Sequence, residues 1–497
     1  MKVNTPIDPA ALAARRKQVA AALLAVLPAR CLLADPDETR PYECDGLSAY
    51  RQMPMLVALP ESEAQILAIL QVCRQLQVPI VPRGAGTGLS GGAMPIVDGL
   101  VLSTAKLNKI VLLDPLARTA RVQPGVRNLA ISDAAAPHGL YYAPDPSSQI
   151  ACTIGGNVAE NSGGVHCLKY GLTIHNVMRV RMVSMDGDIL ELGSEALDCA
   201  GLDLLAVFVG SEGMLGIVTE VTVKLVPKPA AARVIMASFD DVVGGGNAVA
   251  AVIAAGIIPA GLEMMDRTST RMVEPFVKAG YDTDAAAILL CEADGTAEEV
   301  EEEIAHMTAV LGRAGARAIA VSNSDAERIR FWSGRKNAFP AAGRISPDYY
   351  CMDGTIPRKR LADVLLGIEA MESKYGLRCA NVFHAGDGNL HPLILFDANQ
   401  PGEFDRAEAF GADILALCVE VGGTITGEHG VGIEKINSMC VQFAPAEREA
   451  FFALKRAFDP AMLLNPDKAI PTLQRCAEFG KMHVHRGALK FPELPRF

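Results

Sequence analysis

The sequence predicts an α+β protein built from two large parts, and three observations lead to that expectation. Residues 9–27 have the spacing of an amphipathic helix. From Leu56 to about Pro227, short apolar runs typical of strands alternate with glycine-rich turns. Beyond residue 231 the pattern changes to strands separated by longer helices, and a chain of 497 residues can support more than one hydrophobic core.

The N-terminal half is expected to hold short strands, one clear helix and a hairpin. The helix begins at Pro60-Glu-Ser-Glu, a helix-starting pattern, and runs to about Leu76. Asp186-Gly187 favours a tight hairpin turn between two apolar runs. The expected strands are 56–59, 79–82, 178–185 and 188–192.

The C-terminal half is expected to form a sheet with helices on one face. Expected strands are 234–239, 286–291, 351–356, 378–383 and 392–396, and expected helices are 241–255, 296–313 and 358–374, followed by a mostly helical stretch at 400–465. Two prolines in 224–231 mark a linker. The expected divisions are an N-terminal helical segment (1–50), a first domain (51–230), a second domain (231–470) and a tail (471–497).

Composition excludes several classes of protein. The net charge of −11 argues against nucleic-acid binding and against a basic membrane-binding face. No apolar run reaches the roughly 18 residues that a bilayer crossing needs, and the first residues lack a signal peptide's apolar stretch, so a cytoplasmic location is expected. Twelve cysteines are present, none at Cys-x-x-Cys spacing, which argues against an iron–sulfur cluster or a structural zinc site in this chain.

Three glycine-rich loops in the first domain point to a large cofactor. In Arg83–Gly92, Gly86, Gly88 and Gly91 have G-x-G-x-x-G spacing, but a poor helix former follows, so a doubly wound dinucleotide-binding fold is not expected. Backbone N–H groups of such a loop can bind phosphate without a helix. Together with the loops at 143–164 and 210–216, this loop favours a cofactor with adenine, pyrophosphate and ribityl parts.

Two short segments in the second domain predict a metal site. His384 and His391 flank Gly-Asp-Gly-Asn, which disfavours a helix and favours a tight turn that brings both imidazoles to one rim. Glu428 lies in a second glycine-rich turn, so two imidazoles and a carboxylate are available, a usual set for a catalytic divalent metal with an open position. Zinc is compatible, and manganese or iron would also fit. His429, beside the carboxylate, is a candidate general base.

The same segments resemble a known flavoprotein family. The glycine-rich segments resemble the PCMH-type FAD-binding domain of the vanillyl-alcohol-oxidase family; they are Arg83–Gly92, Pro144–Ser148, Ile154–Gly164 and Gly210–Gly216. The C-terminal segments resemble its D-2-hydroxy-acid dehydrogenase branch; they are His384–His391, Glu428-His429 and Leu464–Lys468. Three further strings resemble the FAD-binding D subunits of bacterial glycolate oxidases within that branch, namely Pro41–Tyr50, Arg335–Pro340 and Cys476–His485.

The resemblance implies a fold and a cofactor. It implies a two-part PCMH-type FAD-binding domain, followed by an α+β substrate (cap) domain with a ferredoxin-like sheet and a helical C-terminal segment. Some relatives attach FAD through His or Cys; the first glycine loop has neither, so non-covalent binding is expected. The residues expected to contact FAD are Arg83, Gly84, Ala85, Gly86, Thr87, Gly88, Leu89, Ser90, Pro144, Asp145, Ser147, Ser148, Thr153, Gly155, Gly156, Asn157, Ser162, Gly163, Gly164, Tyr170, Gly171, Glu212, Gly213, Gly216, Ile217 and Asn465.

The resemblance also implies an activity, the oxidation of a small D-2-hydroxy acid, with glycolate to glyoxylate as the leading expectation. Hydride would pass to the flavin while His429 takes the hydroxyl proton beside the metal. Arg335 is expected to clamp the substrate carboxylate, and Asn389 to hydrogen-bond substrate or a metal-bound water. Relatives that oxidise 2-hydroxyglutarate carry threonine and lysine where this chain has Phe339 and Cys351, which favours a small monocarboxylate.

The same resemblance implies that the chain works with partner subunits. Reduced flavin needs an electron acceptor, and companion flavoprotein-like and iron–sulfur subunits are expected to hold the chain at the inner face of the cell membrane and to deliver electrons to quinone. The segment 487–497 could dock such a partner or pack as a terminal strand. Two alternatives stay open: a D-lactate dehydrogenase, and a catalytically silent FAD electron-transfer subunit.

Overall fold

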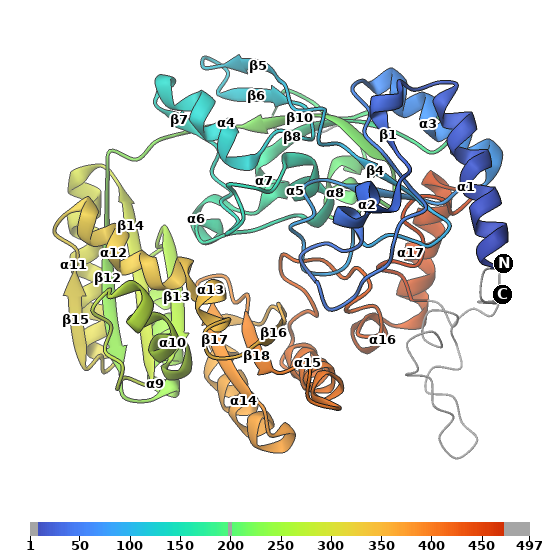
Figure 1. The fold of residues 1–497 in the computed structure, drawn as a ribbon. Helices are drawn as coiled ribbons and strands as arrows, with labels where there is room; N and C mark the ends of the chain where they lie inside the picture. The colour runs from blue at the N-terminus through green and yellow to red at the C-terminus, as the bar shows by residue number, and fades with distance from the viewer. Residues whose placement is uncertain (1–7, 197–200, 472–497) are drawn as a thin grey trace.

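The computed structural model describes residues 8–196 and 201–471, and the expected α+β organisation is confirmed (Figure 1). Residues 32–227 contribute three small sheets, and residues 231–396 contribute one large sheet. The string 476–485 and the segment 487–497 lie outside the described residues. None of the helices in the described part of the chain combines the length and the apolar character that a bilayer crossing requires.

The first sheet has the strand order β1-β2-β4-β3, with parallel pairing of β2, β4 and β3 and an antiparallel edge at β1. Its helices α1 and α3 bury Val19, Leu23, Ile66, Ile69 and Leu70 against it. The bounds are α1 Pro9–Leu24, β1 Leu32–Leu33, α2 Pro36–Thr39, β2 Leu56–Ala58, α3 Glu63–Leu76, β3 Ile80–Arg83 and β4 Leu100–Ser103. The first helix ends three residues before its expected end, and α3 ends where expected.

The second sheet is antiparallel, with the order β5-β6-β10-β8-β9, and the predicted hairpin at Asp186-Gly187 is confirmed as β8–β9. A two-stranded sheet pairs β7 with β11. The strands are β5 Ile110–Asp114, β6 Thr119–Val122, β7 Leu140–Tyr141, β8 Val177–Val183, β9 Ile189–Gly193, β10 Ile217–Lys224 and β11 Val226–Pro227. The helices are α4 Asn128–Ala135, α5 Ile154–Glu160, α6 Cys167–Tyr170, α7 Thr173–Asn176 and α8 Leu204–Phe208.

One element of this part differs from the expected loop. Residues 154–160 form the helix α5, although two of its first three residues are glycines. Ile154 and Val158 are fully buried in the core beneath the second sheet, and Asn161 ends the helix in the left-handed conformation at φ 52°. Burial of these side chains outweighs the unfavourable helix propensity of glycine.

The C-terminal part is built on a seven-stranded antiparallel sheet of order β15-β12-β14-β13-β17-β18-β16. Its strands are β12 Ala231–Phe239, β13 Gly261–Asp266, β14 Ala287–Gly295, β15 Ala318–Val321, β16 Asp348–Cys351, β17 Arg378–Phe383 and β18 Pro392–Phe396. Its helices are α9 Val242–Ala254, α10 Arg267–Val277, α11 Ala297–Arg313, α12 Asp325–Lys336, α13 Ala338–Ala342, α14 Leu361–Tyr375 and α15 Glu403–Glu420.

The expectation of helices on one face of this sheet is wrong. Helices α9, α11, α14 and α15 cover one face, and α10, α12 and α13 cover the other. The reason lies in the strands themselves, because every residue of β13, β18 and the first eight positions of β14 is buried. A sheet that is apolar on both faces needs cover on both.

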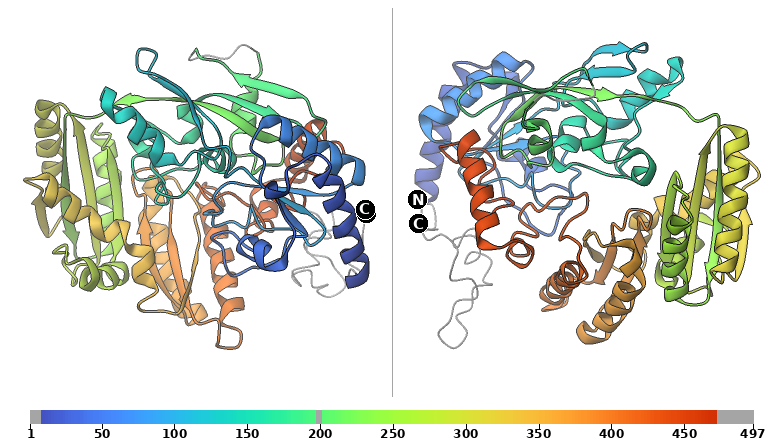
Figure 2. Two further views of the ribbon diagram at one scale, coloured as in Figure 1. Left: turned by 45° about the horizontal axis from the view of Figure 1, so that its top comes forward. Right: turned by 180° about the vertical axis from the view of Figure 1, so that it is seen from behind.

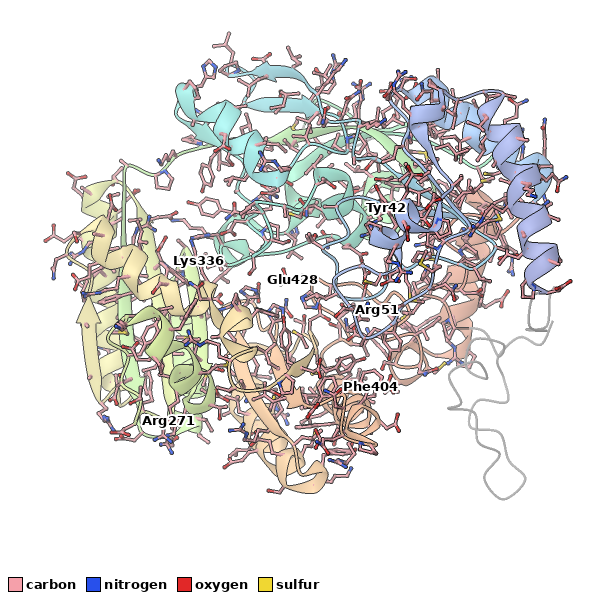
Figure 3. All side chains as sticks on the ribbon, in the orientation of Figure 1. Tyr42, Arg51, Arg271, Lys336, Phe404 and Glu428 are labelled. Atoms are coloured by element: carbon pink, nitrogen blue, oxygen red, sulfur yellow. The ribbon has the colours of Figure 1, made fainter. Side chains whose placement is uncertain are left out.

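After α15 the chain returns to the N-terminal part. Helices α16 (Met439–Gln442) and α17 (Pro445–Phe458) follow, and Leu454 and Phe458 of α17 pack against the core beneath the second sheet. Leu464 then bridges to Ile80 next to the first glycine loop. Both views in Figure 2 show α17 on the same side of the molecule as α1, away from the seven-stranded sheet. The turn at Glu428 belongs to this returning segment and lies between the N-terminal and the C-terminal parts (Figure 3).

Candidate active site

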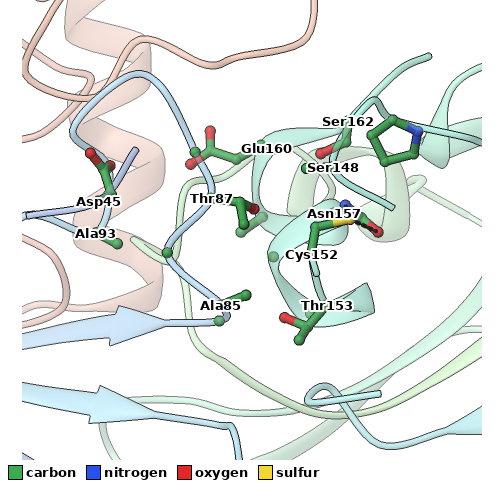
Figure 4. Close-up of a pocket in the computed structure, with 18 of the residues that line it drawn as sticks. Asp45, Ala85, Thr87, Ala93, Ser148, Cys152, Thr153, Asn157, Glu160 and Ser162 are labelled. Atoms are coloured by element: carbon green, nitrogen blue, oxygen red, sulfur yellow. Dashed lines mark hydrogen bonds between the residues drawn. The ribbon is translucent and has the colours of Figure 1, made fainter. Parts of the chain in front are cut away.

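A cavity of about 410 Å³ lies where the two parts meet, and most residues expected to contact FAD line it (Figure 4). These are Arg83, Gly84, Ala85, Gly86, Thr87, Gly88, Leu89, Ser147, Ser148, Thr153, Gly155, Gly156, Asn157, Ser162, Glu212, Gly213, Gly216 and Ile217. His391, Glu428 and His429 line the same cavity. One space therefore joins the glycine loops of the N-terminal part to the donor groups of the C-terminal part.

The glycine loops suit a ligand with a phosphate-rich backbone. Gly86 has φ +73°, a conformation that L-residues rarely adopt, and Arg83 packs directly beneath it. At Gly84 an added Cβ would lie 2.6 Å from Thr153 Oγ1, so the first and second loops are in close contact. Without Cβ atoms, backbone N–H groups can approach a pyrophosphate closely. The cradle thus fits a dinucleotide such as FAD.

The remaining expected FAD contacts do not line the cavity; they are Ser90, Pro144, Asp145, Gly163, Gly164, Tyr170, Gly171 and Asn465. Some of them support the loops: Asn465 Nδ2 donates to the carbonyl oxygens of Gly92 and Glu212 at 3.0 and 2.6 Å. Two others form hydrogen bonds with residues that do not line the cavity. Tyr170 donates its hydroxyl to Asp294 at 2.7 Å, and Asp145 accepts from His166 at 2.7 Å.

His384, His391 and Glu428 converge as the sequence predicted. The strands β17 and β18 pair on either side of a turn, so the two imidazole rings lie 4.9 Å apart. Glu428 Oε1 is 3.3 Å from His384 Nε2 and 3.2 Å from His391 Nε2. One donor atom from each residue lies within 4.8 Å of the others, so the three could hold a metal ion. Both ring nitrogens of His391 are buried without a hydrogen-bond partner among the described residues, which fits a role for this ring as a metal ligand.

Glu263 orients His384 through the Nδ1 atom of its ring. It lies on β13, is almost completely buried, and its Oε1 is 2.8 Å from His384 Nδ1. Burial alone would lower the pKa of His384, but the Glu263 carboxylate raises it to about 10. A cation at Nε2 would replace the proton there while Glu263 keeps the Nδ1–H, the arrangement that metal-ligating histidines usually have.

Arg335 is buried with the same carboxylate rather than standing free in the cavity. Its Nε donates to Glu263 Oε2 at 2.5 Å, and its Nη2 lies 3.4 Å from the ring of His384. Asn389 does not line the cavity either, and its side-chain oxygen would lie 2.4 Å from a Cβ on Gly427. The structure thus brings Arg335 and Asn389 next to the histidine turn, but neither lines the cavity.

Asp353 holds the turn that carries Glu428 and His429. Its Oδ2 accepts the backbone N–H groups of Gly427, Glu428 and His429 at 3.1, 2.9 and 2.7 Å. Its Oδ1 is 2.6 Å from Lys435 Nζ, and both side chains are fully buried. The pKa of His429 is lowered, mainly because burial disfavours the charged ring, although Asp353 acts in the opposite direction. A neutral imidazole at the cavity wall is able to accept a proton.

The wall opposite the glycine loops contains Phe339, Pro340 and Lys336. Phe339 meets His391 edge-on, with ring centroids 6.3 Å apart at 69°. Cys351 is buried and does not line the cavity. In Figure 3 Lys336 and Glu428 both lie in the zone between the two parts of the molecule.

Sequence reasoning missed several residues of the site. The cavity is also lined by Asp45, Pro82, Gly92, Ala93, Thr104, Pro124, Pro146, Cys152, Ala159, Glu160 and Val218. Glu263 and Asp353 were missed as supports, although each carried a signal. Glu263 is an acid within the apolar run of β13, and Asp353 follows the apolar end of β16. A buried acid needs a partner, so such positions indicate a site.

Comparison with known proteins places the chain in a family. Residues 54–193 match the family model described as FAD binding domain, and residues 228–469 match FAD linked oxidases, C-terminal domain. The chain is 63% identical over 482 residues to the glycolate oxidase subunit GlcD of Escherichia coli K12, which covers 97% of each protein. The chain belongs to the GlcD family of FAD-linked oxidases. The predicted family resemblance is confirmed.

Other members of this flavoprotein group are more distant. GlcD of Bacillus subtilis is 41% identical over 428 residues, covering 86% of this chain and 91% of that protein. A D-lactate dehydrogenase of Anaerostipes hadrus is 31% identical over 456 residues, covering 89% and 95%. Among solved structures, p-cresol methylhydroxylase has a TM-score of 0.77 at 18% identity, covering 92% of this chain and 97% of the other, which shows a common PCMH-type fold. Most of the glycine-lined cavity comes from the segment that matches the FAD binding domain.

Proposed function

We propose that this chain oxidises glycolate to glyoxylate with FAD as the hydride acceptor. The observation that supports this most is the single cavity lined by the FAD loops together with His391, Glu428 and His429. The GlcD relatives, 63% and 41% identical, support glycolate as the substrate. The D-lactate dehydrogenase relative is 31% identical, so D-lactate is the substrate to test beside glycolate.

The donor set suits a divalent cation held by His384, His391 and Glu428, with zinc as the first candidate. Bound FAD would supply the hydride acceptor for the carbon that bears the hydroxyl, and a bound cation would lower the pKa of that hydroxyl. Glu263 keeps His384 in the tautomer that presents Nε2 to the cation. Asp353 fixes the backbone of the turn, so Glu428 and His429 keep their positions during turnover.

His429 takes the hydroxyl proton in this proposal. Its ring stacks on His391 at 5.0 Å, and its Nδ1 is buried without a hydrogen-bond partner among the described residues. Asp353 lies 3.9 Å from that nitrogen and stabilises the imidazolium that forms. The same carboxylate therefore holds the turn and favours the protonated product state.

The substrate carboxylate needs a cation. Lys336 is exposed at the cavity wall, whereas Arg335 would have to leave its pair with Glu263 to reach the substrate. Phe339 and Pro340 make the rest of that wall apolar, which disfavours a second carboxylate on the substrate. A small monocarboxylate fits this combination better than a dicarboxylate.

The GlcD relatives are subunits of glycolate oxidase by name, so we also propose that this chain works in a complex. Companion flavoprotein-like and iron–sulfur subunits at the cytoplasmic face of the cell membrane would remove electrons from the reduced flavin.

The test is anaerobic reduction of the purified flavoprotein by candidate acids. Glycolate should bleach the flavin absorbance fastest, ahead of D-lactate, whereas L-lactate and D-2-hydroxyglutarate should act slowly or not at all. Prior removal of metal with EDTA should stop the bleaching, and zinc or manganese should restore it. Bleaching by dithionite but by none of the acids would instead support a silent electron-transfer subunit, and unimpaired bleaching after verified metal removal would exclude the metal role.

A further inference from the structure

Glu292 is a buried acid on β14 that binds groups from both parts of the molecule, and the proposed reaction gives it no role. Two of these groups come from α12: Arg328 Nη1 lies 3.0 Å from Glu292 Oε2, and the indole N–H of Trp332 donates to the same oxygen. The third comes from the N-terminal part, where His166 Nε2 lies 3.4 Å from Oε1. One almost completely buried carboxylate thus joins α12 to the N-terminal part.

His166 connects this carboxylate to a loop of the FAD cavity. Its Nδ1 lies 2.7 Å from Asp145 Oδ2, and its backbone N–H donates to Asp145 Oδ1 at 3.2 Å. The three residues that follow Asp145, 146–148, line the cavity. Burial lowers the pKa of His166, but Asp145 and next Glu292 raise it well above its usual value. A protonated imidazole donates from both ring nitrogens, so it can bond to both carboxylates.

The helix that Glu292 holds leads to the opposite wall of the cavity. Arg335 and Lys336 are the last two residues of α12. Lys336 lines the cavity, and Arg335 is buried next to the ring of His384. Trp332 lies about one turn earlier on the same helix. A chain of contacts therefore runs from the cavity loop through Glu292 to the end of α12.

Close packing surrounds the contact between Trp332 and Glu292. Gly261 pairs with Glu292 across β13 and β14, and both Trp332 and Val165 lie 3.2 Å from the place where a Cβ on Gly261 would be. Val165 belongs to the N-terminal part and is buried in the same apolar cluster as Trp332. Charge-assisted hydrogen bonds are stronger where water is excluded, so this carboxylate is well placed to hold the helix.

Asp294 provides the contrast, because it also joins the two parts but does not bind α12. It lies two residues after Glu292, on the same face of β14. Its carboxylate accepts the Lys169 ammonium at 2.5 Å and the Tyr170 hydroxyl at 2.7 Å, both from α6. In Figure 1, α6 lies on the side of the N-terminal part that faces the seven-stranded sheet. Within residues 8–196 and 201–471, none of the α12 side chains bonds to Asp294.

We propose that Glu292 is a positioning residue, which holds α12 against the N-terminal part and thereby fixes Lys336 and Arg335 relative to the FAD loops. The inference rests on the proposed function, since this placement affects the rate only when an acid reduces the flavin. A displacement of about 1 Å in a group that places the substrate can cost roughly 100-fold in rate. Loss of the Glu292 carboxylate should therefore slow flavin reduction while FAD stays bound.

The first experiment compares Glu292→Gln with Asp294→Asn in the purified holoenzyme. Each change neutralises one carboxylate that joins the two parts, so both variants should have a lower Tm and an unchanged FAD content. Anaerobic flavin reduction by glycolate should slow at least about tenfold in Glu292→Gln and less than about threefold in Asp294→Asn. Reoxidation of the reduced flavin by an artificial quinone should keep its rate in both. Equal slowing in the two variants, or a normal rate in Glu292→Gln, would overturn the proposal.

The second experiment measures amide hydrogen exchange of the same holoenzymes and needs no substrate. The amides of α12 should exchange at least about tenfold faster in Glu292→Gln than in the wild type, because the helix loses its anchor. In Asp294→Asn they should keep the wild-type rate. Unchanged exchange of α12 in Glu292→Gln would overturn the proposal. If no acid reduces the wild-type flavin, the proposed function fails, and this comparison still decides whether Glu292 holds α12.

A third pair of variants decides the question if Glu292→Gln fails to fold. Arg328→Met removes one partner of Glu292 at a partly exposed position and leaves the other two contacts in place. The matched control is Arg330→Met, because Arg330 is exposed on the same helix and pairs with Glu327 instead. Arg328→Met should speed α12 exchange and slow flavin reduction, each by at least about threefold, and Arg330→Met should do neither. Equal behaviour of the two variants would overturn the proposal.

Discussion

Substitution of Asp353 by asparagine tests whether the turn at Glu428 and His429 governs the chemistry. The carboxylate accepts three backbone N–H groups of that turn and pairs with Lys435. Asparagine has nearly the same volume but no charge, and its NH₂ group cannot accept a hydrogen bond. The NH₂ group of the asparagine must therefore face either the backbone N–H groups or the ammonium of Lys435. In both places one hydrogen-bond donor meets another.

The expected loss of stability follows from the buried ion pair of Asp353 and Lys435. Burial opposes ionisation of Asp353, yet Lys435 and next His429 lower its pKa from 3.8 to about 2. That difference corresponds to about 2 kcal/mol of stability, which is complete above pH 3.8 and is lost as the pH falls toward 2. Removing one partner of a buried pair costs about 3–5 kcal/mol, because the other charge is left behind. Glu434, 3.0 Å from Lys435, still compensates that charge, so we expect a cost near the lower end, about 3 kcal/mol.

The assay combines thermal unfolding with turnover at neutral pH. Asp353→Asn should lower Tm by roughly 6–12 °C if the affected unit has about 150–250 residues, retain FAD, and lose at least about 100-fold in kcat, the scale of a misplaced general base. Asp459→Asn is the matched control, because Asp459 and Lys455 form a similarly buried pair with a 2.7 Å contact and neither residue lines the cavity. It should lose stability but keep its turnover. Normal kcat in Asp353→Asn despite a lower Tm would refute the assigned role of the turn.

Three further substitutions test other parts of the site. Glu263→Gln should lower metal affinity about 10- to 100-fold in chelator competition, because the carboxylate that orients His384 and pairs with Arg335 becomes a neutral amide; unchanged affinity would contradict that role. His429→Asn should retain FAD while kcat falls about 10²- to 10⁴-fold, and near-normal turnover would exclude His429 as the base. In Gly163→Ala the new Cβ would lie 2.6 Å from Glu428 Oε2, so metal content should fall while FAD content stays constant; a full complement of metal would show that Glu428 is not a ligand.

Local sequence was sufficient for features that depend on neighbouring residues. The hairpin β8–β9 follows from Asp-Gly between two apolar runs, and the β17–β18 pair follows from a glycine-rich turn that no helix could accommodate. The same turn brings His384 and His391 together, so their proximity was predictable from a short stretch of chain. The approach of Glu428 was indicated by its glycine-rich turn and by the family resemblance, but by no spacing rule, because nearly forty residues separate it from His391.

Features that depend on distant residues were not predictable in the same way. Helix α5 forms in a glycine-rich segment because its apolar side chains find a core elsewhere in the domain. Cover on both faces of the large sheet has a partial local signal, because β18 and residues 287–291 of β14 are unbroken apolar runs that fit strands buried on two sides. Which helices supply that cover depends on residues far away in the chain.

Glu263 and Asp353, which support the candidate site, show what a buried acid in the sequence can indicate about distant residues. Glu263 is 121 residues from His384, and Asp353 is 76 residues from His429, so no spacing rule connects either pair. Each is nevertheless an acid among buried residues, and burying an unpaired carboxylate costs far more than one hydrogen bond returns. Such an acid must meet a cation, an imidazole or several N–H groups. In a chain that also carries a turn flanked by two histidines, a buried acid within or directly after an apolar strand therefore predicts a residue that positions the site.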